Sequence, residues 1–109
     1  MFNIDHIPEF DQTVEVRMPR DDGVETQTFK ARFRVIPDEE EETGRLNWVA
    51  QAKARLCARI VSFDDIVDGK GKAIPFDDAL LDRMLAREDV RIALFEAYAN
   101  GLTEARTGN

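Results

Sequence analysis

The sequence predicts an α+β protein in which an N-terminal β-hairpin packs against a small bundle of three to four α-helices. Two observations support this fold class. Apolar and polar residues alternate over residues 13–36, which is the period of half-buried strands. After Pro37 the apolar residues recur at helical spacing. Because a lone hairpin is not stable in water, we expect the helices to cover its apolar face.

The length of the chain suits a single domain. Its 109 residues can form one modest hydrophobic core. We expect four parts, which are an N-terminal arm over 1–12, the hairpin over 13–36, a mainly helical region over 37–100 and a frayed tail over 101–109.

The two strands of the hairpin have matching apolar faces. In TVEVRMP apolar residues alternate with charged ones, and the same alternation returns in FKARFRV after the turn sequence PRDDG. A turn over residues 21–24 would pair Val16 with Phe29 and Val14 with Ala31. This register places both apolar sets on one face of the hairpin.

The acidic run DEEEE at 38–42 follows Pro37 directly. Acidic residues after a proline suit the first turn of a helix, where they meet the positive end of the helix dipole. A solvated loop is the alternative. A functional interpretation is that the run attracts a basic partner.

The next helix is predicted from Arg45 to Val61. Its apolar arc contains Leu46, Val49, Ala50, Leu56, Cys57 and Ile60. This arc is the expected core face. It predicts Cys57 to be a small buried hydrophobic residue rather than a reactive thiol.

Trp48 falls on the opposite side of this helix, beside Arg55 and Arg59. One interpretation is that Trp48 packs under the acidic run or under the turn at 64–75. The other is that it is exposed between arginines, which is a composition typical of binding hot spots.

The stretch DDIVDGKGKAIPFDD at 64–78 resembles a calcium-binding loop in its acidic residues and central glycine. A calcium loop needs an oxygen ligand at its third position and a glutamate at its twelfth. Counted from Asp64, those positions hold Ile66 and Pro75, so the calcium interpretation fails. The glycines instead predict a small second hairpin or an extended loop. Asp77 then suits the N-cap of a helix with an apolar face formed by Leu80, Leu81, Met84 and Leu85.

The last helix is predicted from Asp89 to Asn100, with Gly101 as its C′ residue. Apolar residues spread over about 220° of its circumference. A helix that covers one core needs little more than about 100°. Either this helix is buried on most sides or part of its surface, with Phe95 and Tyr98, meets another chain.

Composition and motifs argue against several function classes. A net charge of −7 argues against nucleic-acid binding, which needs a dense basic surface. With one histidine, His6, neither a His-based metal site nor a Ser/His/Asp triad is easily built. The single cysteine rules out an internal disulfide and fits a reducing compartment. No P-loop, CxxC, HExxH or GxSxG motif occurs. We therefore expect no catalytic residues, no cofactor and no metal.

The N-terminus and the hydropathy predict where the protein acts. MFNIDHIPEF has acidic residues where a secretory signal would need a basic start and an apolar stretch. No apolar run is long enough to span a bilayer. A soluble protein of the cytoplasm, without a membrane partner, is expected.

The order of several short motifs resembles the tail assembly chaperones of long-tailed bacteriophages and prophages. The resemblance covers roughly residues 28–109, with motif pieces at Phe29–Pro37, Phe63–Phe76, Leu80–Tyr98 and Gly108–Asn109. The chain departs from the family pattern at Phe63, where tryptophan is usual, and in its acidic 38–42 run.

The resemblance implies a non-catalytic role. Such chaperones coat the helical tape measure protein during tail assembly, help to recruit tail tube subunits and leave before the tail is finished. A homo-oligomer is expected as well. The partner-binding residues that we predict are Trp48, Arg55, Arg59, Phe95 and Tyr98.

Two alternatives stay open at the level of sequence. A head–tail connector or tail terminator would share the size and acidity of this chain but would persist in the virion. A small metal-dependent enzyme would use Asp64, Asp65, Asp77 and Asp78, since paired carboxylates can bind a metal or transfer protons.

Overall fold

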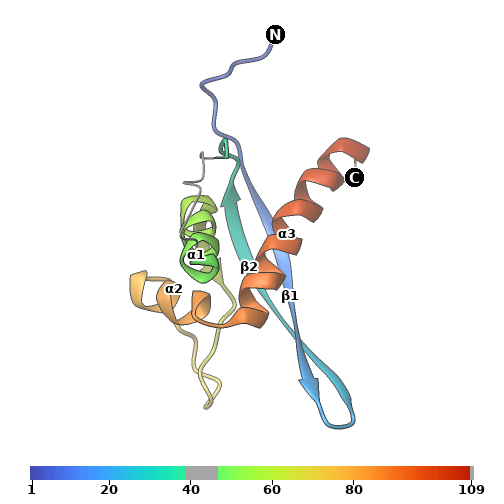
Figure 1. Cartoon of the computed structure of the whole chain (residues 1–109), viewed down its shortest axis with the longest axis vertical. Helices are drawn as coiled ribbons and strands as arrows, with labels where there is room; N and C mark the ends of the chain where they lie inside the picture. Colours follow the sequence, from blue (N-terminus) through green and yellow to red (C-terminus); the bar gives the residue numbers. More distant parts are fainter. Residues whose placement is uncertain (39–46, 109) are drawn as a thin grey trace.

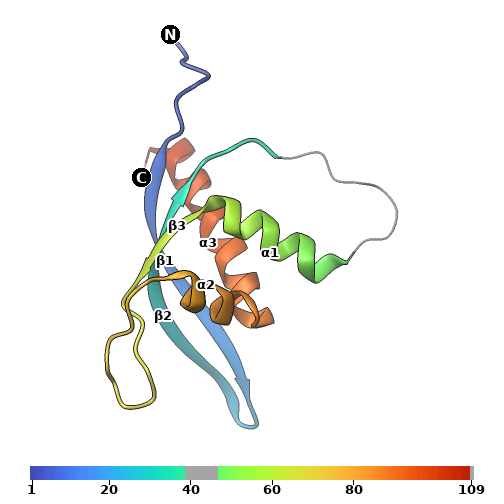
Figure 2. The same ribbon diagram turned by 90° about the vertical axis from the view of Figure 1, so that its left-hand side faces the viewer.

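The computed structural model describes residues 1–38 and 47–108. Their elements are β1 (Glu9–Arg20), β2 (Gly23–Arg34), α1 (Trp48–Arg59), β3 (Ile60–Asp64), α2 (Asp78–Leu85) and α3 (Glu88–Thr107). The strands form an antiparallel sheet in the order β1-β2-β3. All of these helices lie on one face of the sheet (Figures 1 and 2). The α+β class predicted from the sequence is confirmed.

The hairpin forms as predicted, but its register differs by two residues. Val14 pairs with Phe29 and Val16 with Gln27, because the turn contains only Asp21 and Asp22. The predicted pairing of Val16 with Phe29 is therefore wrong. A shift of two residues leaves every side chain on its original face, since the strand period is two. The hydrophobic pattern alone could not separate the two registers.

The core lies between the apolar face of the sheet and α3. Val14, Phe29 and Phe33 are buried on the sheet side, and Val90 and Leu94 are buried on α3. The strands thus present their predicted apolar face to a helix. The opposite face of the sheet is charged, and Arg32 bonds there to Glu9 and Asp11 at 2.8 and 3.0 Å.

The region over 37–100 is less helical than predicted. The helix expected to reach Val61 ends at Arg59, and Ile60 begins a strand. β3 pairs with β2 through Lys30–Phe33, so Ala31 lies opposite Phe63. A helical continuation would have left this part of the β2 edge unpaired. The predicted turn of 64–75 follows, and Val67 pairs with Ala73 across it.

Two parts predicted to lie outside the fold belong to it. β1 begins at Glu9, so residues 9–12 of the predicted arm are part of the sheet. The last helix does not stop at Gly101; it continues to Thr107, and Gly108, with φ of 77°, provides the left-handed cap. Phe10 packs with Phe33 and Tyr98 at ring centroid distances of 5.5 and 5.8 Å. These contacts hold the start of β1 against the core, while residues 102–108 are exposed.

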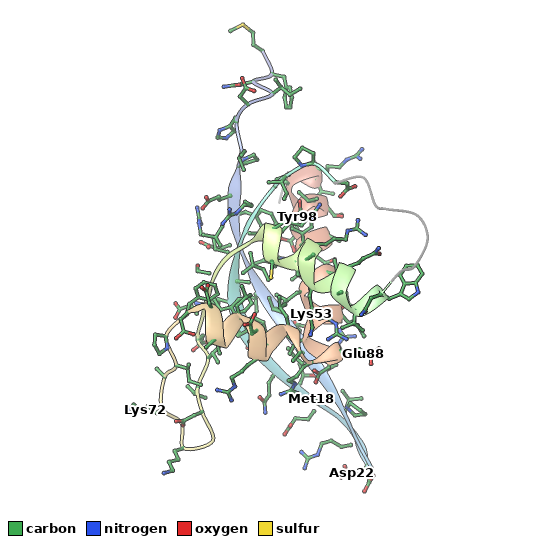
Figure 3. All side chains as sticks on the ribbon, turned by 60° about the vertical axis from the view of Figure 1, so that its left-hand side comes forward. Met18, Asp22, Lys53, Lys72, Glu88 and Tyr98 are labelled. Atoms are coloured by element: carbon green, nitrogen blue, oxygen red, sulfur yellow. The ribbon has the colours of Figure 1, made fainter. Side chains whose placement is uncertain are left out.

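The predicted start of α2 is confirmed. The carboxylate of Asp77 accepts a 2.7 Å hydrogen bond from the Leu80 N–H, which is the N-cap interaction. Figure 3 shows Asp22 at the tip of the hairpin and Lys72 in the loop after β3. The predictions for residues 39–46, which include most of the acidic run and Leu46, lie outside the described residues.

Candidate functional site

Trp48 is the most exposed aromatic residue on the helices of the described chain. The side chain of Asn47 accepts a 3.1 Å hydrogen bond from the Ala50 N–H, so the helix begins with Trp48. The indole is 72% exposed. The interpretation that it packs under the turn at 64–75 is therefore wrong, and the exposure expected in the alternative is observed. Most of the acidic run named in the first interpretation lies outside the described residues. In Figure 2 this end of α1 projects away from the sheet.

Other exposed apolar residues lie on α1 and α3, which pack against each other. We define the α1–α3 apolar surface by Trp48, Val49, Ile92, Phe95 and Leu102, each at least 36% exposed. Phe95 and Leu102 are seven residues apart and therefore lie on the same line along the helix. Exposed apolar residues on neighbouring helices are candidates for a protein-binding surface.

The structure gives Arg59 a role inside the protein. Its side chain is only 8% exposed and donates to the Asp38 carboxylate at 2.8 Å and to the Arg55 carbonyl at 3.0 Å. Its guanidinium carbon also lies 5.6 Å from the centroid of the Tyr98 ring. Arg59 is therefore not available to a partner in the way we predicted, and it links α1 to α3 and to Asp38.

Tyr98 and Arg55 differ in how far they are exposed to solvent. Tyr98 is half-buried, and its ring meets Phe33 edge-on at 5.6 Å. Figure 3 shows Tyr98 near the C-terminal end of α1. Arg55 is 48% exposed and lies 3.7 Å from the Asp38 carboxylate. Of the five predicted residues, Trp48, Phe95 and Arg55 thus offer side-chain surface to a partner.

Two of the four aspartates of the alternative enzyme interpretation accept local hydrogen bonds with their carboxylates. Asp77 caps α2, and Asp64 accepts a 2.8 Å hydrogen bond from the Asp65 N–H. Over residues 1–38 and 47–108, no group of three or more His, Cys, Asp or Glu residues could hold a metal ion. The carboxylates at 64–65 and 77–78 do not build a metal centre in that part of the chain.

Cys57 is exposed, so the prediction that it is buried is wrong. The buried residues of α1 are Leu56 and Arg59, and Cys57 points away from both. Partial burial raises the pKa of the thiol, and the charges of Asp82 and Asp78 raise it further. The thiolate fraction at neutral pH is correspondingly low.

A second surface was missed by the sequence reasoning. The outer edge of β1 runs beside glutamates of α3, where two adjoining grooves occur. The glutamates are visible in the sequence at intervals of eight residues. Nothing in the sequence indicated that a free strand edge lies next to them, because that depends on the packing of α3.

No protein-family model, no curated protein and no solved structure matches this chain. In the described part of the chain, no helix combines the length and the hydropathy that a membrane crossing requires. The site is therefore described by its geometry alone, which is a set of exposed apolar side chains on α1 and α3.

Proposed function

We propose that this chain is a non-catalytic tail assembly chaperone of a long-tailed bacteriophage or prophage and that it acts in the bacterial cytoplasm. The observation that carries the proposal is the 72% exposed Trp48 on the projecting end of α1. The motif order at 29–37, 63–76 and 80–98 supports the choice of family.

The proposed partner is the tape measure protein, and tail tube subunits are a second partner. A tape measure helix that is not yet assembled presents an apolar stripe to water. Amphipathic helices bind apolar surfaces through residues spaced at three and four positions. The α1–α3 apolar surface offers Trp48, Phe95 and Leu102 for such contacts. The net charge of −7 would keep the bound complex in solution.

Co-expression with the candidate tape measure protein tests the proposal. The chain is tagged and produced with the long helical protein encoded next to it, and soluble co-purification is measured. Trp48→Ala and Phe95→Ala should each reduce capture without unfolding the chain. Val24→Ala is the matched control, because Val24 is a 67% exposed apolar residue on the hairpin. A long protein that stays insoluble with every version of the chain would contradict the proposal.

The single tryptophan gives an independent readout. Its emission in the free protein should be that of a water-exposed indole, and it should shift to shorter wavelength when the partner covers Trp48. Purified particles provide the other test. A chaperone should be absent from finished virions, whereas a connector or tail terminator should be detected there by mass spectrometry.

A further inference from the structure

The outer edge of β1 is an unpaired strand edge. β1 spans 12 residues and is the border strand of the sheet. In the described part of the chain, its pairing is with β2, and its backbone makes no hydrogen bond to a turn, loop or helix. Such an edge offers a row of N–H and C=O groups to a further strand. Figure 1 shows β1 at the border, with α3 running obliquely along it.

A groove follows this edge where α3 lies beside β1. It has a volume of about 490 Å³, and a second hollow of about 330 Å³ continues it towards Pro19. The acidic residues that line the two hollows are Asp11, Glu15, Glu88, Asp89, Glu96 and Glu104. Among the described lining residues, the basic one is Arg17. The groove is therefore strongly negative.

The carboxylates of α3 carry most of this unbalanced charge. Asp89 is paired with Arg87 at 2.7 Å, and Asp11 is paired with Arg32 at 3.0 Å. Within the described residues, Glu88, Glu96 and Glu104 form no ion pair, and the Glu104 carboxylate accepts only long hydrogen bonds of 3.4 and 3.5 Å from the Gln12 amide. Three glutamates along one helix thus face the groove without a cation.

The charge of the groove decides which strand fits the edge. A second copy of this chain that paired edge to edge would bring two acidic flanks together, and like charges oppose such pairing. A basic strand would instead be attracted to the acidic groove. The three glutamates follow each other every eight residues, which is about 12 Å along the helix. Alternate residues of a strand are about 7 Å apart, so an extended segment with alternating lysines would carry several cations along the length of the groove.

We propose that the outer edge of β1 binds an extended basic segment of a partner protein as a fourth strand of the sheet. The backbone of β1 supplies the hydrogen bonds, and Glu88, Glu96 and Glu104 select lysine or arginine on the side facing α3. This surface adjoins the α1–α3 apolar surface at Ile92, which lines the second hollow, whereas Trp48 and Phe95 line neither hollow. The proposal goes beyond the chaperone function and does not depend on it.

Fluorescence anisotropy with a labelled peptide tests this proposal on the full chain. The probe matches β1 in length, with 12 residues, and alternates lysine with threonine and valine. We expect saturable binding that weakens with salt. The triple variant Glu88→Gln, Glu96→Gln and Glu104→Gln should weaken binding about tenfold or more. The control variant Asp22→Asn, Asp65→Asn and Asp82→Asn makes the same change of net charge away from the groove and should bind as the wild type does.

Two further peptides separate strand addition from diffuse attraction between charges. One has the same composition in scrambled order, and the other has proline in place of threonine and valine, so that it lacks those backbone donors. Both should bind at least about tenfold more weakly. Equal binding of either peptide, or of the triple variant, would overturn the proposal. So would sedimentation showing that the free chain dimerises through β1. Trp48 and Phe95 are unchanged throughout, so failure here would leave the chaperone proposal standing.

Discussion

The ring of Phe10 packs against Gly101 and fills the space that a side chain there would need. A Cβ at Gly101 would lie 2.9 Å from two of the ring carbons and closer still to a third. This contact joins β1 to the last turns of α3. It explains why glycine stands inside a helix, where it costs about 1 kcal/mol relative to alanine.

Gly101→Ala should therefore destabilise the protein although alanine favours helix. We expect a loss of about 1–3 kcal/mol in the free energy of unfolding, the range for an overpacked core. Urea denaturation measures it, with Asn100→Ala at an exposed position of the same helix as the control. In a Phe10→Ala background the same substitution should become neutral or stabilising. A Gly101→Ala variant that is as stable as the wild type would contradict this account of the contact.

Arg59→Ala should lower stability by about 1.5–3 kcal/mol, the range for hydrogen bonds to charged groups. The substitution removes the bonds to Asp38 and to the Arg55 carbonyl and the contact with Tyr98. Arg59→Lys keeps the charge but not the planar group that makes these contacts, so it should recover only part of the loss. Arg55→Ala is the control, because Arg55 is 48% exposed. If Arg59→Ala and Arg55→Ala lowered the free energy of unfolding equally, the buried contacts of Arg59 would not be the cause of its effect.

Asp77→Ala should cost about 1 kcal/mol, because the Leu80 N–H at the start of α2 loses its acceptor. Asp77→Asn and Asp77→Ser keep an oxygen at this position and should retain most of the stability. Thermal unfolding of the three variants measures the difference. If all three variants lose the same amount of stability, the carboxylate of Asp77 contributes more than the N-cap hydrogen bond.

The stability contributed by Asp89 should depend on pH. The hydrogen bond from Arg87 lowers the pKa of Asp89 below its ordinary value of 3.8. The folded state therefore keeps Asp89 ionised at a pH where the unfolded state has bound a proton. The contribution is fully present above the unfolded pKa and is lost as the pH falls through the folded pKa. Because Arg87 is 55% exposed, we expect at most about 1 kcal/mol.

Urea denaturation between about pH 7 and pH 2 tests this dependence. The difference in stability between the wild type and Asp89→Asn should be largest near neutral pH and should shrink below about pH 4. Arg87→Gln should move the loss to higher pH. Glu88→Gln, in the same helical turn but without an ion pair in the described chain, should have a smaller effect. A difference that stays constant with pH would exclude the ion pair as its cause.

The local signals in the sequence determined the hairpin, the start of α2 and the presence of α1 and α3. The alternation of apolar residues predicts a strand without knowledge of what the strand packs against. An aspartate placed before a helical pattern predicts an N-cap in the same way. The same reasoning singled out Trp48 and Phe95, although it could not decide whether Trp48 is exposed.

The tertiary structure decided what depends on contacts between distant residues. β3 forms because the edge of β2 at Lys30–Phe33 is there to pair with Ile60–Asp64. Position 101 requires glycine because Phe10, distant in sequence, packs where a side chain would lie. The acidic groove exists because α3 runs beside the free edge of β1. None of these relations is encoded in a local period, since each requires the packed positions of two elements at once.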